Sequence, residues 1–155
     1  NQLIHALVSN PPVNIIAAEP DQMPEGRGAL FTPEENCIYV RKGMSAQEIF
    51  QCITPELALA GFANGNKNYD RSEDVFYAYS TSYMLCKKYG VDTQHFDFSN
   101  SSEFFENMEP QEVRAELAKA QESFKAITAR MERTLGQERN ASAKQQPQQN
   151  REEAR

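Results

Sequence analysis

The chain has 155 residues, of which 39% are hydrophobic and 25% are charged, so it is long enough to bury a core and has the composition of a globular domain. Its formal net charge of −6 argues against tight binding to a phosphate backbone, which requires clustered lysines and arginines. No apolar stretch approaches the length of a membrane span, and the N-terminal residues lack the pattern of a signal peptide. Because the chain starts at Asn1 rather than at a methionine, we expect it to be a piece of a longer protein.

The first part of the chain predicts one helix and three strands. Apolar side chains recur on one side of a helix over residues 2–8, and Asn10-Pro11-Pro12 ends that helix. Apolar and β-branched runs predict strands at residues 13–18, 29–32 and 37–41. The turn-forming residues 33–36 join the last two strands as a hairpin. We therefore expect a small, mostly antiparallel sheet.

The helix from Ser45 to Gly61 is predicted to pack on this sheet and to be the centre of the fold. Ser45 and Glu48 have the spacing of a capping box. Apolar residues then recur at helical spacing around Ile53. Pro55 lies in the interior of this helix, where a proline removes a backbone hydrogen bond and costs about 3 kcal/mol.

Three further helices are predicted after a polar loop at residues 64–68. Asp70 and Glu73 form a capping box at the start of the first, and Gly90 ends it. A short helix starts at Asn100. A long helix starts at Pro110 and runs to about Leu135, with Gly136 as its stop.

The apolar residues of the long helix have the spacing of a coiled-coil seam. They are Val113, Leu117, Ala120, Phe124, Ile127, Met131 and Leu135. Two interpretations remain open, because such a helix can pack across its own domain or extend beyond it to a partner. The candidate partner-binding face consists of Val113, Leu117, Phe124, Ile127 and Met131.

Residues 137–155 contain no large apolar side chain, so they predict a disordered tail or linker after a domain at residues 1–136. The three cysteines are Cys37, Cys52 and Cys86, and no pair has the C-x-x-C spacing. We expect them to be buried free thiols in a reducing, cytoplasmic compartment. His5 and His95 show no metal-ligand spacing with them.

Several segments in this order resemble the zincin-type domain of ArdC-like antirestriction proteins and their ImmA/IrrE-like relatives, including LtrC-like proteins of conjugative elements. The matching segments lie within about residues 28–135. They are residues 38–41 with 43–45, the helix at 48–61, residues 83–93 and residues 110–117. The resemblance implies an α+β, zincin-like fold, in which a small sheet packs on a central helix and further helices follow.

The family's zinc site depends on an H-E-x-x-H motif, in which two histidines bind the metal and the glutamate activates the metal-bound water. By this resemblance the histidine positions fall at Pro55 and Leu59, the glutamate at Glu56, and the third ligand at Tyr79. Proline and leucine cannot bind zinc, and one phenol is not a site. The resemblance therefore implies the fold without the metal, any other cofactor or the peptidase activity.

Two roles remain open for Glu56. It is either a favourable carboxylate in the first turn of a helix that restarts at Thr54 and Pro55, or a remnant of the catalytic site. We also expect Pro55, Leu59 and Tyr79 to fill the former cleft as an apolar plug, with the Tyr79 hydroxyl bonded to Glu56.

The resemblance leads us to expect a catalytically inactive interaction module of a bacterial mobile element, with a protein partner in antirestriction or conjugative transfer. The alternative is an accessory domain that binds single-stranded DNA, which the acidic charge and the lack of aromatic residues among lysines and arginines disfavour. An active peptidase would need His5 or His95 beside Glu56. We expect no membrane partner, and the sequence indicates no oligomeric state.

Overall fold

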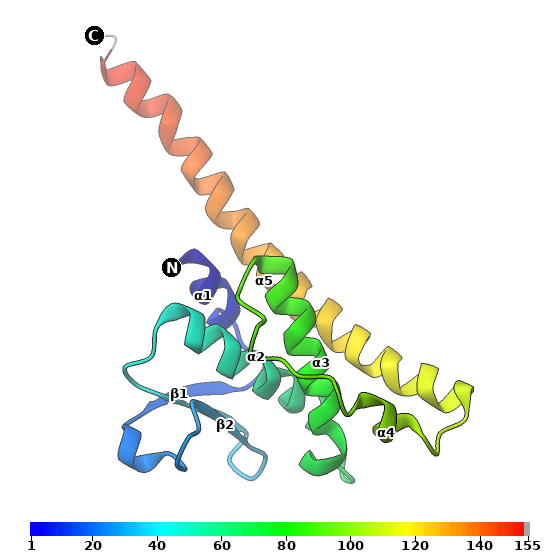
Figure 1. The fold of residues 1–155 in the computed structure, drawn as a ribbon. Helices are drawn as coiled ribbons and strands as arrows, with labels where there is room; N and C mark the ends of the chain where they lie inside the picture. The colour runs from blue at the N-terminus through cyan, green and yellow to red at the C-terminus, as the bar shows by residue number, and fades with distance from the viewer. Residues whose placement is uncertain (154–155) are drawn as a thin grey trace.

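A computed structural model describes the backbone of residues 1–153 and the side chains of residues 1–145 (Figure 1). The fold is α+β, as predicted, and consists of a three-stranded sheet and several helices. The elements are α1 (Gln2–Val8), β1 (Asn14–Ala18), the 3-10 helix η1 (Pro20–Gln22), β2 (Ala29–Thr32), β3 (Cys37–Arg41), α2 (Ala46–Ala63), α3 (Arg71–Tyr89), α4 (Ser101–Phe105) and α5 (Pro110–Glu153). In the described part of the chain, no helix combines the length and the apolar character needed to cross a membrane.

The sheet is mixed and has the strand order β1-β3-β2. Strands β2 and β3 form the predicted antiparallel hairpin, in which Phe31 lies opposite Ile38. Strand β1 runs parallel to β3, with Ile15 opposite Ile38 on its other side. The prediction of a mostly antiparallel sheet is therefore wrong for β1. Apolar periodicity identifies a strand but not its neighbour, and the connection after β1 is long enough to place β2 on the far side of β3.

Helix α2 forms the centre of the core. Its predicted capping box is present: Ser45 accepts a hydrogen bond from the Glu48 N–H, and the Glu48 carboxylate accepts one from the Ser45 N–H. The buried side chains of Phe50, Ile53 and Leu57 join residues of the sheet, α1, α3 and α5 in one hydrophobic cluster. Each of these side chains stabilises the fold by about 1.5–3 kcal/mol through its burial.

Helix α2 continues through Pro55 without a restart. The buried Thr54 hydroxyl donates to the Phe50 carbonyl at 2.8 Å and lies 2.7 Å from the Ser82 hydroxyl of α3. An N-cap side chain accepts from an N–H ahead of it, whereas Thr54 bonds a carbonyl one turn behind it. The expected helix start at Thr54 and Pro55 is therefore wrong.

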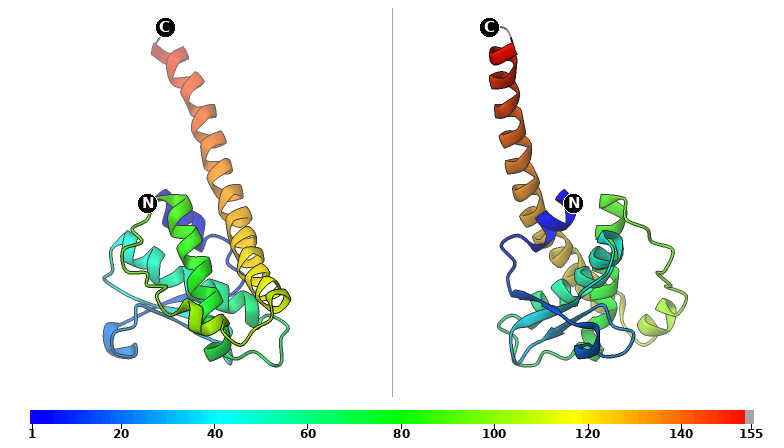
Figure 2. Two further views of the ribbon diagram at one scale, coloured as in Figure 1. Left: turned by 45° about the vertical axis from the view of Figure 1, so that its right-hand side comes forward. Right: turned by 90° about the vertical axis from the view of Figure 1, so that its left-hand side faces the viewer.

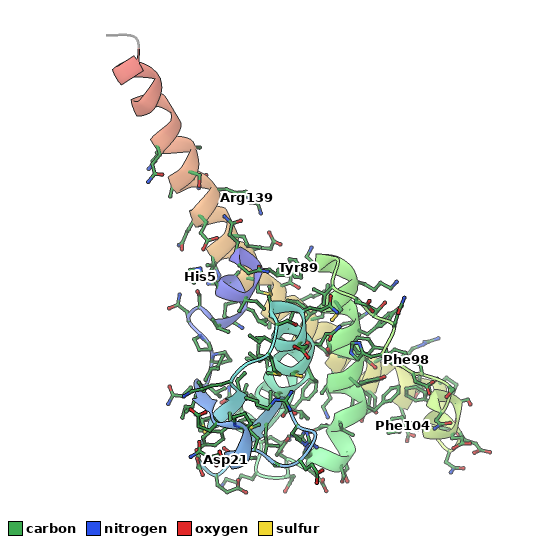
Figure 3. All side chains as sticks on the ribbon, turned by 60° about the vertical axis from the view of Figure 1, so that its left-hand side comes forward. His5, Asp21, Tyr89, Phe98, Phe104 and Arg139 are labelled. Carbon is green, nitrogen blue, oxygen red and sulfur yellow. The ribbon has the colours of Figure 1, made fainter. Side chains whose placement is uncertain are left out.

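Helix α3 starts and ends as predicted, at the Asp70 cap and at Gly90, which has a left-handed φ of 70°. The Asp70 carboxylate accepts from both the N–H and the hydroxyl of Ser72, so Ser72 rather than Glu73 completes the cap. The segment after Gly90 folds back along α3 through α4. Aromatic rings line this contact, with Phe76 stacked on Phe104 at a centroid distance of 4.6 Å (Figure 3).

Helix α5 starts at Pro110 as predicted but continues to Glu153, so the predicted end at Leu135 is wrong. Gly136 does not adopt the left-handed conformation of a helix stop. A single glycine within a helix costs about 1 kcal/mol, and the glutamate, arginine and alanine residues that follow favour helix. The helix projects away from the body of the molecule (Figure 2).

Residues 137–153, predicted as a disordered tail or linker, thus have a helical backbone. Residues 154–155 of that predicted tail lie outside the described part of the chain. A linker role for this segment stays a prediction.

Candidate functional site around Glu56

Glu56 lies where α2 meets strand β2 and the start of α3, and its side chain is only 4% exposed. The Arg71 guanidinium holds both carboxylate oxygens, with Nη1 2.8 Å from Oε2 and Nη2 2.6 Å from Oε1. The Phe31 backbone N–H donates to Oε2 at 2.9 Å, and Arg27 Nη1 lies 3.4 Å from Oε1. All four contacts come from N–H groups, and two of the three residues that donate them are arginines. The buried negative charge is therefore compensated by a bidentate ion pair.

The Phe31 N–H reaches Glu56 because it lies on the outer edge of β2. The Arg41 N–H donates to the Gly28 carbonyl, so this pair of opposite residues is hydrogen-bonded. Bonded and non-bonded pairs alternate along an antiparallel ladder, which points the Phe31 backbone groups away from β3. Glu56 thus supplies the acceptor that a neighbouring strand would otherwise provide.

Arg71 is the first residue of α3, directly after the Asp70 cap. Its hydrogen bonds to Glu56, followed by the attraction of the Glu56 charge, raise the pKa of Arg71 above its usual range, although partial burial acts in the opposite direction. The pair joins the start of α3 to the middle of α2. It therefore connects two helices that pack closely on each other.

The Glu56 contacts favour the structural role over the catalytic remnant. A general base needs an oxygen within reach of the proton that it removes. Here Oε1 faces Arg71 and Arg27, and Oε2 faces Arg71 and the Phe31 N–H. The role differs from the first-turn carboxylate that we expected, because α2 has no second start at this position.

Tyr79 does not bond Glu56, so the expected hydrogen bond between them is wrong. The Tyr79 hydroxyl accepts from the Asp97 backbone N–H at 2.6 Å, and its ring packs on Phe96 and Phe98 at centroid distances of 4.8 and 5.1 Å. The segment after α3 provides all three partners. Figure 3 shows Phe98 of this segment beside α3. The phenol is satisfied by a chain reversal that the sequence pattern did not predict.

The other two positions that the resemblance assigns to metal ligands lie on α2. Leu59 is 1% exposed and belongs to the hydrophobic core, and Pro55 is half-buried. Among the residues described, no three His, Cys, Asp or Glu side chains are grouped in a way that could hold a metal ion. The cysteines are free thiols: Cys37 and Cys86 are buried, and Cys52 is half-buried.

The seam of α5 packs mainly within its own domain. Met131 is fully buried, Ile127 is 7% exposed and Phe124 packs against the core. Met131 and Ile127 are therefore unavailable to a partner, and Phe124 is half-buried, because α5 crosses α1, α2 and α3 there. Val113 is also half-buried and Leu117 is 41% exposed, so Leu117 is the most accessible residue of the face.

Arg71 and Arg27 are the site residues that sequence reasoning missed. One signal in the sequence pointed to Arg71. Glu56 is flanked by core positions of its helix, so its buried charge needs a cationic partner, and Arg71 is the first residue of the next helix. Arg27 lies in a loop between strands, where no spacing rule applies. A similar pair joins the buried Asp74 of α3 to Lys119 of α5 at 2.9 Å.

No protein-family model matches this chain, and no curated protein or solved structure shows significant similarity to it.

Proposed function

We propose that this domain is a catalytically inactive, zincin-like relative of zinc metallopeptidases that acts as a protein-interaction module. We place it in the cytoplasm of a bacterium, on a mobile genetic element, in antirestriction or conjugative transfer. The observation that carries the proposal is the bidentate contact between Arg71 and the one residue of the motif that keeps its type, Glu56. The biological setting rests on the resemblance of the sequence segments.

The Arg71 contact supports this proposal because it competes with catalysis. In a zinc peptidase the glutamate must turn one oxygen to the metal-bound water. Withdrawing Glu56 from Arg71 would leave a buried charge without its partner, which costs about 3–5 kcal/mol. A glutamate held in this way stabilises the domain instead of activating water.

The zinc content of metal-reconstituted, tag-free protein tests the inactive state. We expect close to no zinc per wild-type chain by elemental analysis after dialysis. A matched variant that carries Pro55→His, Leu59→His and Tyr79→Glu restores the family's ligand types, and we expect it to retain zinc. One zinc per wild-type chain would overturn the proposal. A folded triple variant without zinc would contradict the zincin-like placement of the three positions.

The protein partner is expected at the accessible end of the α5 face, around Val113 and Leu117. A photo-crosslinking residue at position 117 should give a defined adduct in cells of the native host, and the same probe at position 75 should not. Val75 is a suitable control because it is 46% exposed on α3, close to the 41% of Leu117. Equal labelling from the two positions would contradict this surface.

A measurement of binding to single-stranded DNA distinguishes the protein-interaction module from the alternative, a domain that binds nucleic acid. We expect no change in the fluorescence anisotropy of a labelled oligonucleotide at physiological salt. Binding that weakens steeply as salt rises would support the nucleic-acid function in place of the protein module.

A further inference from the structure

A pocket of about 410 Å³ lies between α5, the end of α2 and the segment that follows α1. Part of its lining is apolar, because Leu57 of α2 and Ile127 of α5 are buried core residues and Phe62 packs against the core. Small residues, Gly61 and Ala126, leave the space open, and a Cβ added at Gly61 would meet nothing within 4 Å. The pocket has the size of small-molecule sites, which measure about 300–1,000 Å³.

The charged residues that line this pocket all come from α5. They are Lys119, Glu122, Arg130 and Arg133. Lys119 already pairs with Asp74 of α3 at 2.9 Å. Two arginines and one glutamate remain, which gives the pocket a net charge of +1 in a chain whose net charge is −6. In the described part of the chain, neither arginine has a carboxylate partner.

Arg130 has one nitrogen that is bonded and one that is not. Nη1 donates to the carbonyls of Leu7 and Ser9, 2.8 and 2.7 Å away, at the end of α1. Nη2 is buried, and no hydrogen-bond partner for it is found among the described residues. Burial, followed by the charge of Arg133, lowers the pKa of Arg130. An anion beside this guanidinium would supply the missing acceptor and offset the repulsion from Arg133.

We propose that this pocket binds a small molecule in which one carboxylate is joined to an apolar body, such as a medium-chain carboxylic acid. The apolar body packs against Leu57, Phe62 and Ile127, and the carboxylate accepts from Arg130 and Arg133. The two arginines are three positions apart on α5, so their side chains are neighbours on the helix surface. A carboxylate matches the net charge of +1, whereas a phosphate monoester carries about −1.5 to −2 at pH 7. The site is independent of the protein partner proposed above.

Isothermal titration calorimetry of the full chain with octanoate tests the site. We expect saturable binding of one octanoate per chain. 1-Octanol has a comparable apolar chain without the charge and should bind about tenfold more weakly. Octyl phosphate should also bind more weakly than octanoate. The absence of saturable octanoate binding, or equal binding of 1-octanol, would overturn the proposal, and tighter binding of octyl phosphate would overturn the choice of a carboxylate.

Two variants with matched controls locate the site. Arg133→Gln should weaken octanoate binding about tenfold, whereas Arg114→Gln, at an exposed arginine of α5 outside the pocket, should leave it unchanged. Gly61→Leu fills the pocket but keeps both arginines, so it should abolish binding. Gly136→Leu should bind octanoate like the wild type, because Gly136 also has open space around it but lies outside the pocket. Equal binding by either variant and its control would refute the site.

Discussion

Substitution of Glu56 by glutamine tests whether the fold depends on this carboxylate. The amide has nearly the same shape as the carboxylate, so the change removes charge without opening a cavity. Its oxygen can still accept from the Phe31 N–H. Its NH₂ group, however, must face the Arg71 guanidinium, which also carries only donors. The substitution therefore isolates the ion pair from the packing of α2.

The expected loss of stability follows from the burial of the two partners. Breaking a buried pair by removing one partner costs about 3–5 kcal/mol. Arg71 is 30% exposed and can recover part of its hydration, which reduces the loss. We expect Glu56→Gln to lower the free energy of unfolding by about 2–3 kcal/mol. For a chain of this size, that corresponds to a decrease in Tm of about 4–12 °C.

Urea unfolding followed by tyrosine fluorescence measures this change, because the chain has six tyrosines and no tryptophan. The control is Glu19→Gln, which removes an exposed carboxylate that pairs with Lys42. An exposed pair of this kind contributes at most about 1 kcal/mol. A Glu56→Gln variant as stable as the wild type, or more stable, would refute the structural role. That result would instead fit a carboxylate kept for chemistry at the expense of stability.

Four further substitutions test other parts of the fold in the same unfolding assay. Pro55→Ala should stabilise the chain by about 1–3 kcal/mol, because it restores a helical N–H at a continuous part of α2, and a loss of stability would show that the ring is needed for packing. Met131→Ala should lower the free energy of unfolding by about 2–5 kcal/mol and Leu117→Ala by less than about 1 kcal/mol, because only Met131 is buried. Similar losses for the two variants would contradict the packing of α5. Burial raises the pKa of Cys86 from 9.0 to about 11, so the folded chain keeps a proton that the unfolded chain loses. Stability should therefore fall between about pH 9 and pH 11, and this fall should be smaller in Cys86→Ala, whereas an unchanged slope would exclude the thiol as its cause.

Local signals predicted the elements well, because they depend on neighbouring residues. The caps at Ser45 and Asp70, the left-handed stop at Gly90 and the hairpin at residues 29–41 all follow from chemistry within a few positions. The end of α5 was predicted wrongly because the local signal at Gly136 is weak. A glycine is only a weak stop when the residues beyond it favour helix.

The site itself could be predicted only in part, because its contacts are distant in sequence. The resemblance singled out Glu56, yet its partners lie 15, 25 and 29 positions away. The parallel placement of β1 next to β3 is likewise set by the path of a connection. The Tyr79 hydroxyl bonds Asp97 because the chain reverses after α3, and no periodicity in the sequence marks that reversal.

The hydrogen bond from Phe31 to Glu56 also protects the β2 edge of the sheet. A backbone N–H that a carboxylate already holds cannot pair with a further strand, so the β2 edge offers no free donor at Phe31. Glu56 therefore makes this edge a poorer template for edge-to-edge association with another chain.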